Sequence, residues 1–197
     1  SAPKAGLWLY DPPKATAELF SSHGARARAV QRLEDLSPEA PGVLVIGEQA
    51  LDDMAQQGGG WAAAEFGSRL SALVRGGWRL LVLRQDAYPG GMFPVQLAAN
   101  SRSTMAFATM DSHPVLRGLP EDAFKFWQPD EVVTAGELLR PLTGGFLPLV
   151  VAGYPDGLSH CALLEAPRGK GAYLFCQMPL VQRFATEPMA AEVLNRQ

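Results

Sequence analysis

The sequence Val43-Leu44-Val45-Ile46-Gly47-Glu48 decides the fold class. Its first four residues are all aliphatic, and three of them are β-branched. An apolar run without alternating polar residues is typical of a parallel strand that helices cover on both faces. We therefore expect a buried strand that ends at the glycine and the glutamate.

On either side of this run, apolar segments alternate with segments of helical spacing. Residues 6–10 form a short apolar run that Asp11-Pro12-Pro13 interrupts, which predicts a first strand followed by a helix. Residues 25–30 predict a short second strand. Residues 61–74 have helical spacing that ends at Gly76-Gly77, and another apolar run, residues 78–84, follows.

This alternation predicts an α/β fold: a three-layer, doubly wound, mostly parallel sheet with flanking helices. Residues 87–145 are rich in proline and glycine, which predicts long loops with a few short elements. Three further strands are expected at residues 147–152, 161–166 and 172–176, joined by turns at Pro155-Asp156-Gly157 and at residues 168–171, before a final helix.

Length and charge restrict the classes of protein. The chain has 197 residues and a formal charge of −3, which favours one domain over residues 1–197 and gives no sign of a nucleic acid or membrane partner. The start, Ser1-Ala2-Pro3-Lys4, lacks the pattern of a signal peptide. A helix that begins near Glu187 meets no capping signal before residue 197, so we expect a segment of a longer protein.

Cysteines and histidines are few. Cys161 and Cys176 both lie in apolar strand-like runs, so they are expected to be buried thiols, with a bridge between neighbouring strands as the alternative. His23, His113 and His160 have no metal-ligand spacing, and His113 before a proline is typical of a loop anchor. We expect no metal and no cofactor.

Several segments together resemble class I glutamine amidotransferase-like (flavodoxin-like) domains, and more narrowly those attached to bacterial glycoside hydrolases of the β-galactosidase type. The resemblance spans nearly the whole chain. Its most particular marks are Phe126-Trp127 and the sequence from Cys176-Gln177 to Pro188. The other segments that carry it are Asp11, residues 43–48, residues 76–85, residues 113–119 and Gly169-Lys170-Gly171.

Catalytic members of this superfamily place a cysteine nucleophile in a sharp strand-to-helix turn. The strand end that corresponds to it here reads Leu83-Arg84-Gln85-Asp86-Ala87 and has no thiol. The resemblance therefore implies a domain that is not an enzyme.

Polar side chains follow four of the apolar runs, and ligands of α/β sheets bind beyond the carboxyl ends of strands. These side chains are the candidate binding residues: Asp11, Glu48, Gln85, Asp86 and Gln177. The alternative for each is a helix cap or a loop anchor. Trp127 is the candidate for stacking on a sugar, and a core position is its alternative.

Three hypotheses follow. The first is a non-catalytic accessory domain of a larger glycoside hydrolase, which packs on other domains of the parent chain, contacts carbohydrate or forms a homo-oligomer. The second is a stand-alone carbohydrate-active hydrolase that uses two of Asp11, Glu48 and Asp86 as catalytic acids in a closed pocket. The third is an interaction domain with an apolar patch on residues 87–130. The compartment stays open, including the periplasm or secretion if the parent chain has a signal peptide.

Overall fold

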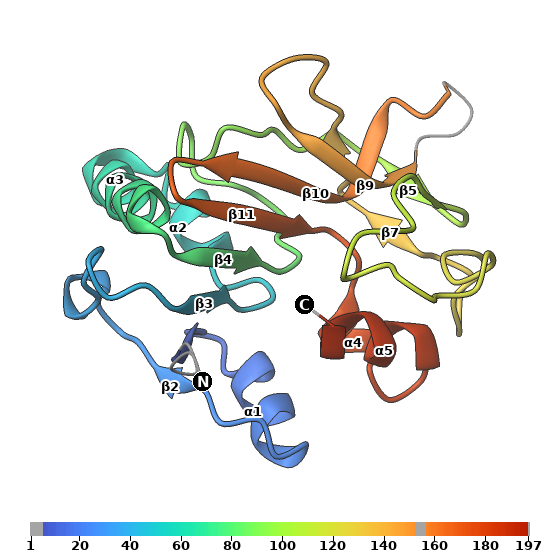
Figure 1. The fold of residues 1–197 in the computed structure, drawn as a ribbon, viewed down its shortest axis with the longest axis horizontal. Coiled ribbons are helices and arrows are strands. Elements are labelled where there is room, and N and C mark those ends of the chain that lie inside the picture. Colours follow the sequence, from blue (N-terminus) through green and yellow to red (C-terminus); the bar gives the residue numbers. More distant parts are fainter. Residues whose placement is uncertain (1–5, 153–156, 197) are drawn as a thin grey trace. The chain divides into compact units, whose positions relative to one another are not determined.

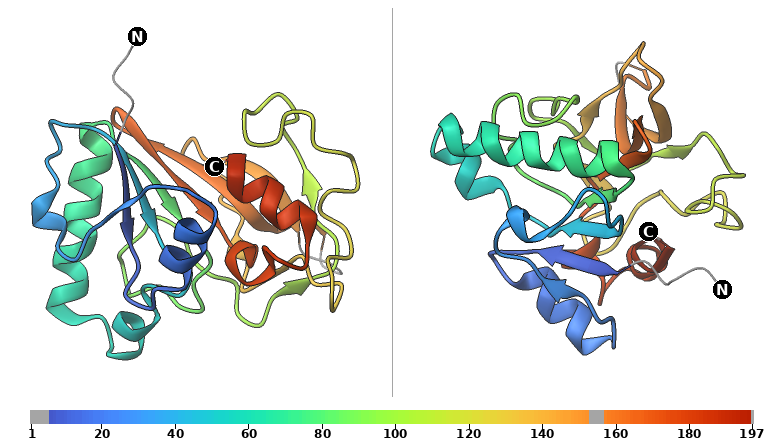
Figure 2. Two further views of the ribbon diagram at one scale, coloured as in Figure 1. Left: turned by 90° about the horizontal axis from the view of Figure 1, so that it is seen from below. Right: turned by 60° about the vertical axis from the view of Figure 1, so that its left-hand side comes forward.

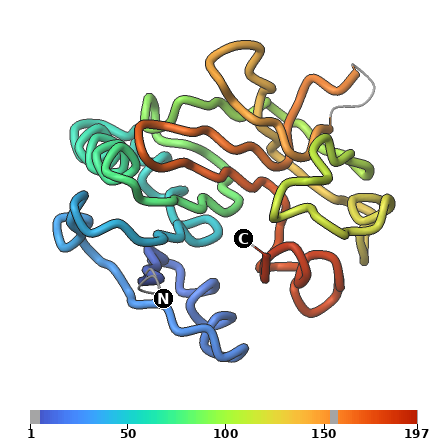
Figure 3. The backbone as a smooth tube through the Cα atoms, in the orientation of Figure 1, coloured from blue at the N-terminus to red at the C-terminus, as the bar shows by residue number. Residues whose placement is uncertain are grey.

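The computed structural model describes residues 6–152 and 157–196. They form two compact units, drawn in Figure 1 and traced along the chain in Figure 3. Unit 1 comprises the described residues of Ser1–Pro94 together with Ala166–Leu174, and unit 2 comprises those of Val95–Glu165 and Phe175–Gln197. The expectations for residues 1–4 and for Pro155 and Asp156 lie outside the described residues.

Unit 1 is built on parallel strands in the order β2-β1-β3-β4, after which comes β11. The register pairs Leu9 with Val45, and Val45 with Leu81. Helices α1 and α3 lie on opposite faces of these strands, so unit 1 has three layers (Figure 2). The elements of this unit are β1 (Leu7–Tyr10), α1 (Ala15–Ser22), β2 (Arg28–Ala29), the 3-10 helix η1 (Leu33–Asp35), β3 (Val43–Ile46), α2 (Asp52–Gln56), α3 (Gly60–Gly76), β4 (Arg79–Val82) and the first part of β11 (Gly171–Cys176).

Burial explains the central strands of unit 1. Apart from the half-buried Val43, the aliphatic side chains of β3 and β4 are buried, as the continuous apolar runs predict. Helix α3 ends where the sequence predicts, because Gly77 takes a left-handed φ of 120°. This conformation lets the N–H groups of Gly77 and Trp78 donate to the carbonyls of Val74 and Leu73, which closes the last turn.

Unit 2 contains antiparallel strands. β10 (His160–Arg168) pairs with β9 (Leu147–Ala152) and with β8 (Leu138–Leu139), and β9 pairs with β6 (Phe107–Ala108). β5 (Arg102–Ser103) and β7 (Thr134–Ala135) form a separate ribbon, and two helices, α4 (Leu180–Arg183) and α5 (Pro188–Arg196), complete the unit. The proline- and glycine-rich segment thus holds long loops with short strands, as expected.

Counted over the described residues, nine strands belong to one mixed sheet with flanking helices. The expected α/β class is therefore confirmed. The parallel arrangement holds for β1 to β4, whereas β10 pairs antiparallel with both β8 and β9. Within residues 6–152 and 157–196, no helix is long and apolar enough to cross a bilayer.

Candidate functional site

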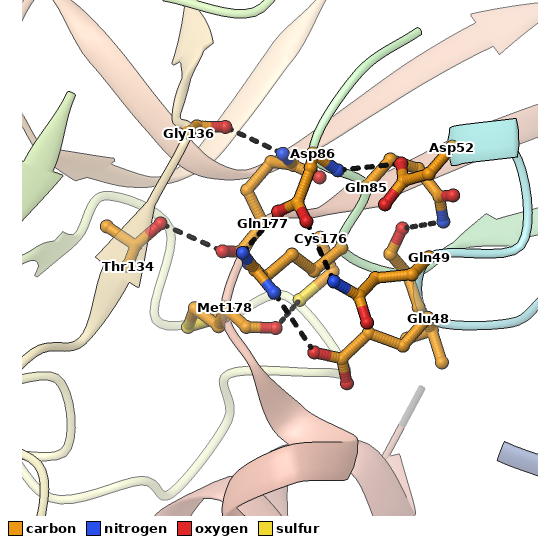
Figure 4. A network of polar contacts seen from close by, with 12 residues as sticks. Glu48, Gln49, Asp52, Gln85, Asp86, Thr134, Gly136, Cys176, Gln177 and Met178 are labelled. Carbon is orange, nitrogen blue, oxygen red and sulfur yellow. Dashed lines mark hydrogen bonds and ion pairs between the residues drawn. The ribbon is translucent and has the colours of Figure 1, made fainter. Parts of the chain in front are cut away.

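Three of the expected candidates lie together at the carboxyl ends of β3 and β4 in unit 1. Glu48 follows β3, and Gln85 and Asp86 follow β4, which is its parallel neighbour. Their side chains contact the turn after β3 and the segment after β4 (Figure 4). We call residues 47–52 and 84–87 the strand-end clamp.

Gln85 is the centre of the clamp. Its side chain is fully buried, and its Oε1 accepts a hydrogen bond from the Leu51 backbone N–H at 2.8 Å. Its Nε2 donates to the carbonyl oxygens of Gly47 and Leu83 at 2.8 and 2.7 Å. The amide therefore joins two strand ends through backbone groups, which is a structural role.

Asp52 and Gln49 reinforce the same junction. Asp52 Oδ1 accepts hydrogen bonds from the backbone N–H groups of Asp86 and Ala87 at 2.9 and 3.2 Å. Burial raises the pKa of Asp52, and these two hydrogen bonds oppose the rise. Gln49 has a left-handed φ of 59°, and its Nε2 donates to Asp86 Oδ2 at 2.7 Å. The turn is thus held in a conformation that few non-glycine residues adopt.

Arg84 is an ionic centre within the clamp. Its Nη1 lies 3.7 Å from Oε1 of Glu48, and its Nη2 contacts Oδ1 of Asp86. Glu48 is only 3% exposed, and burying its charge is costly unless a cation accompanies it. Two carboxylates therefore contact one guanidinium group, and Glu48 is the buried one of the two.

Asp11 has a separate position at the end of β1. Its Oδ2 accepts a hydrogen bond from the Ala17 N–H at 2.8 Å, which caps the first turn of α1. Its Oδ1 is buried without a hydrogen-bond partner among the described residues and lies against Gly47, where a Cβ would come within 2.3 Å of it. Burial raises the pKa of Asp11, while hydrogen bonds from the backbone of Ala17 and Thr16 oppose this.

Gln177 belongs to unit 2 and is fully buried. Its side-chain Nε2 donates to the Gly136 carbonyl at 2.6 Å, and its backbone carbonyl accepts a hydrogen bond from Thr134 Oγ1 at 3.0 Å (Figure 4). Its backbone N–H donates to the carbonyl of Ala162. These contacts match those of a loop anchor.

Trp127 is a core residue of unit 2, which corrects the expectation of a sugar-stacking surface. The side chain is 1% exposed, and its indole N–H donates to the Ala123 carbonyl at 2.7 Å. A ring without exposed faces cannot stack on a carbohydrate. Its neighbour Phe126, which has a left-handed φ of 52°, is 51% exposed.

Neither thiol is placed as a nucleophile. Cys161 and Cys176 are free and buried, as the apolar strand runs predict. Burial in β10 raises the pKa of Cys161 to about 12. At neutral pH this sulfur is a protonated thiol, and the thiolate is the reactive form.

The histidines of unit 2 are engaged by glutamates. His113 Nε2 lies 2.9 Å from Glu165 Oε2, consistent with a loop anchor, and His160 Nδ1 lies 2.8 Å from Glu137 Oε2. Among residues 6–152 and 157–196, no group of three or more histidine, cysteine, aspartate or glutamate residues could hold a metal ion.

Comparison with known proteins gives relatives by structure alone. No family model matches the chain, and no curated protein matches its sequence. A protein from Bacteroides uniformis described as ThuA-like has a TM-score of 0.59 at 11% identity, over 100% of this chain and 92% of its own. A cytoplasmic protein from Salmonella typhimurium has a TM-score of 0.58 at 12% identity, over 92% of this chain and 83% of its own.

A β-galactosidase from Rahnella sp. gives a TM-score of 0.49 at 13% identity, and the match spans only 27% of that enzyme. A likeness this weak supports no argument. The two stronger likenesses show the fold alone: this chain shares its α/β fold, a mixed sheet with flanking helices, with both proteins, one of which is described as ThuA-like.

Proposed function

We propose that this chain is a non-catalytic amidotransferase-like domain that serves a larger carbohydrate-active protein, a glycoside hydrolase, as an accessory domain. The observation that carries the proposal is the Gln85 side chain. It stands after β4, where the sequence resemblance expects the nucleophile, and its amide forms hydrogen bonds with the backbone groups of Leu51, Gly47 and Leu83.

A catalytic turn holds its nucleophile at an exposed position next to a base. In this chain the segment after β4 is tied to the turn after β3 by Gln85, Asp52 and Gln49 instead. Each of these contacts favours a closed, stable strand end. The buried thiols, which lie elsewhere along the chain, agree with a domain that does no acyl-transfer chemistry.

The alternative hydrolase needs two acids that face one sugar, one of them with a raised pKa. Glu48 and Asp86 both pair with the guanidinium group of Arg84, so neither carboxylate faces an open sugar site alone. Asp11 has a raised pKa, but the cavity that it lines is not lined by Glu48 or Asp86. This arrangement favours binding over hydrolysis.

Exposed apolar side chains in unit 2 support contact with other domains or with a second copy. Met105, Phe107 and Phe126 are 37%, 41% and 51% exposed, and all three fall within the segment for which an interaction surface is expected. Large aromatic side chains are favoured anchors of protein interfaces.

The first test measures turnover by the purified chain with glutamine and with a panel of p-nitrophenyl glycosides. We expect release of ammonia or nitrophenol at the rate of buffer alone. Turnover that disappears in both Asp11→Asn and Glu48→Gln, while Gln57→Ala retains it, would overturn the proposal in favour of the hydrolase.

The second test concerns the accessory role and uses the natural gene product that carries this sequence. We expect a longer protein whose glycosidase turnover persists when residues 1–197 are removed, with altered oligomeric size or sugar affinity. A natural product that consists of this chain alone would contradict the accessory role.

A further inference from the structure

A cavity of about 470 Å³ lies in unit 1 at the carboxyl ends of β1 and β2, beside the start of α1. Its volume falls within the roughly 300–1,000 Å³ of sites for small molecules. The carboxyl edge of an α/β sheet is also where such sites occur. The cavity is outside the strand-end clamp, since none of the residues 47–52 and 84–87 lines it.

The lining combines apolar walls with a small set of polar side chains. Leu9 of β1 and Val30, which follows β2, are both buried, and their backbones are joined by a hydrogen bond from the Val30 N–H to the Leu9 carbonyl. Asp11, Lys14 and Gln31 supply the polar groups, and the last two side chains are exposed. An ammonium and an amide that are open to solvent can exchange water for a ligand.

The charges in the lining argue against an anionic ligand. The first turn of a helix binds phosphate through free N–H groups, but in α1 the Ala17 N–H already donates to Asp11 Oδ2 at 2.8 Å. The carboxyl group of Asp11 would also lie close to an anion. Asp11 and Lys14 carry opposite formal charges, so the site suits a neutral ligand that both accepts and donates hydrogen bonds.

We propose that this cavity binds a neutral, monosaccharide-sized polyhydroxy ligand, with its C–H surface on the apolar walls and its hydroxyl groups on Lys14 and Gln31. The choice of a sugar rests on the proposed function, because a carbohydrate-active parent protein would bring such ligands to this domain. The inference adds a location and a ligand class to that function.

The backbone conformation of Lys14 allows its side chain to be removed without disturbing the turn. Lys14 has a left-handed φ of 70°, a conformation that glycine adopts without strain. Lys14→Gly therefore removes the ammonium while it keeps the turn into α1. Gln31→Ala removes the amide from an exposed position. Lys170→Gly and Gln57→Ala change exposed residues of unit 1 outside the lining and serve as matched controls.

The experiment follows backbone amide signals of the full chain by NMR during titration with D-galactose, D-mannose, D-glucose and their 6-phosphates. We expect at least one neutral sugar to shift the signals of residues 9–17 and 29–31. Each lining variant should weaken this binding about three- to tenfold, as the loss of one hydrogen bond implies, and neither control should do so.

No shifts with any neutral sugar, equal binding by the lining variants, or tighter binding of the 6-phosphates would each overturn the proposal. The two proposals fail separately. Sugar binding together with hydrolysis would remove the non-catalytic function and leave the cavity assignment intact. Absence of binding in a chain without turnover would remove only the cavity assignment.

Discussion

The Leu51 backbone N–H donates to the side-chain oxygen of Gln85 across two neighbouring strand ends, at 2.8 Å. The contact joins the turn after β3 to the segment after β4, and it lies at the carboxyl edge where an α/β sheet ordinarily presents ligands or nucleophiles. Hydrogen bonds from Gln49 to Asp86, and from the backbone of Asp86 and Ala87 to Asp52, join the same two segments. The residues at this edge therefore bind one another.

Gln85→Ala should destabilise unit 1. The substitution leaves the Leu51 N–H without its partner, removes one hydrogen bond from each of the carbonyls of Gly47 and Leu83, and opens a small cavity, so the unfolding free energy should fall by about 2–4 kcal/mol. Urea unfolding measures this value. The exposed Gln57→Ala is the matched control, and equal effects of the two substitutions would contradict the structural role of Gln85.

Arg84→Met should also lower the unfolding free energy, by at least about 2 kcal/mol, because it removes the cation beside the buried Glu48 carboxylate. Adding Glu48→Gln should recover part of the loss, since the remaining group is then neutral. A single-variant cost of about 0.5 kcal/mol or less would instead be typical of a surface ion pair and would exclude an ionic centre in the clamp.

Gly47→Ala should cost about 1–3 kcal/mol, because the new methyl group would come within 2.3 Å of Asp11 Oδ1. The penalty should shrink in an Asp11→Ala background, where no carboxylate opposes the methyl group. Thermal unfolding of the four proteins in this cycle gives the coupling. If the two substitutions change the unfolding free energy additively, the new methyl group does not clash with the Asp11 carboxylate.

The pH dependence of stability should change when Asp11 loses its titratable group. Its folded pKa lies above the ordinary value of 3.8 because the carboxyl group is partly buried. The folded state therefore holds its proton more tightly than the unfolded state, so this contribution is present at pH below 3.8 and is lost as the pH rises through the raised pKa.

Relative to Asp11→Asn, the wild-type protein should thus lose unfolding free energy as the pH rises from 3.8 through the raised pKa of Asp11. Asp52, whose pKa is also raised by burial, should behave in the same direction. The lowered pKa values of the exposed Glu34 and Asp130 make stability rise with pH instead. Both residues are present in the wild type and in the variant, so their contributions cancel in the difference between the two curves. A wild-type curve parallel to that of Asp11→Asn would contradict the assignment.

The sequence predicts much of unit 1 because its signals are local. The continuous apolar run of β3 and the glycine pair after α3 depend on burial and backbone conformation, which neighbouring residues determine. Polar residues at strand ends were also predictable. Their mutual contacts were not, because Leu51 is 34 positions from Gln85, and Asp86 is 34 positions from Asp52.

The position of Trp127 could not be predicted from the sequence. An aromatic residue in a long loop has the same sequence signature whether it faces a ligand or the core, and only tertiary packing distinguishes them. Lys14 and Gln31 were missed for a related reason. Nothing in their sequence context differs from ordinary loop residues, and only the pairing of β1 with β2 brings them to one cavity.

The measurement that tests the absence of a catalytic thiol most directly is a titration of the native protein with Ellman's reagent at neutral pH. The buried positions of both cysteines predict that neither reacts on the time scale of a free thiol, and that both react once the chain is unfolded. Rapid reaction of one thiol in the folded protein, slowed by bound glutamine and abolished by Cys161→Ser or Cys176→Ser, would contradict the account.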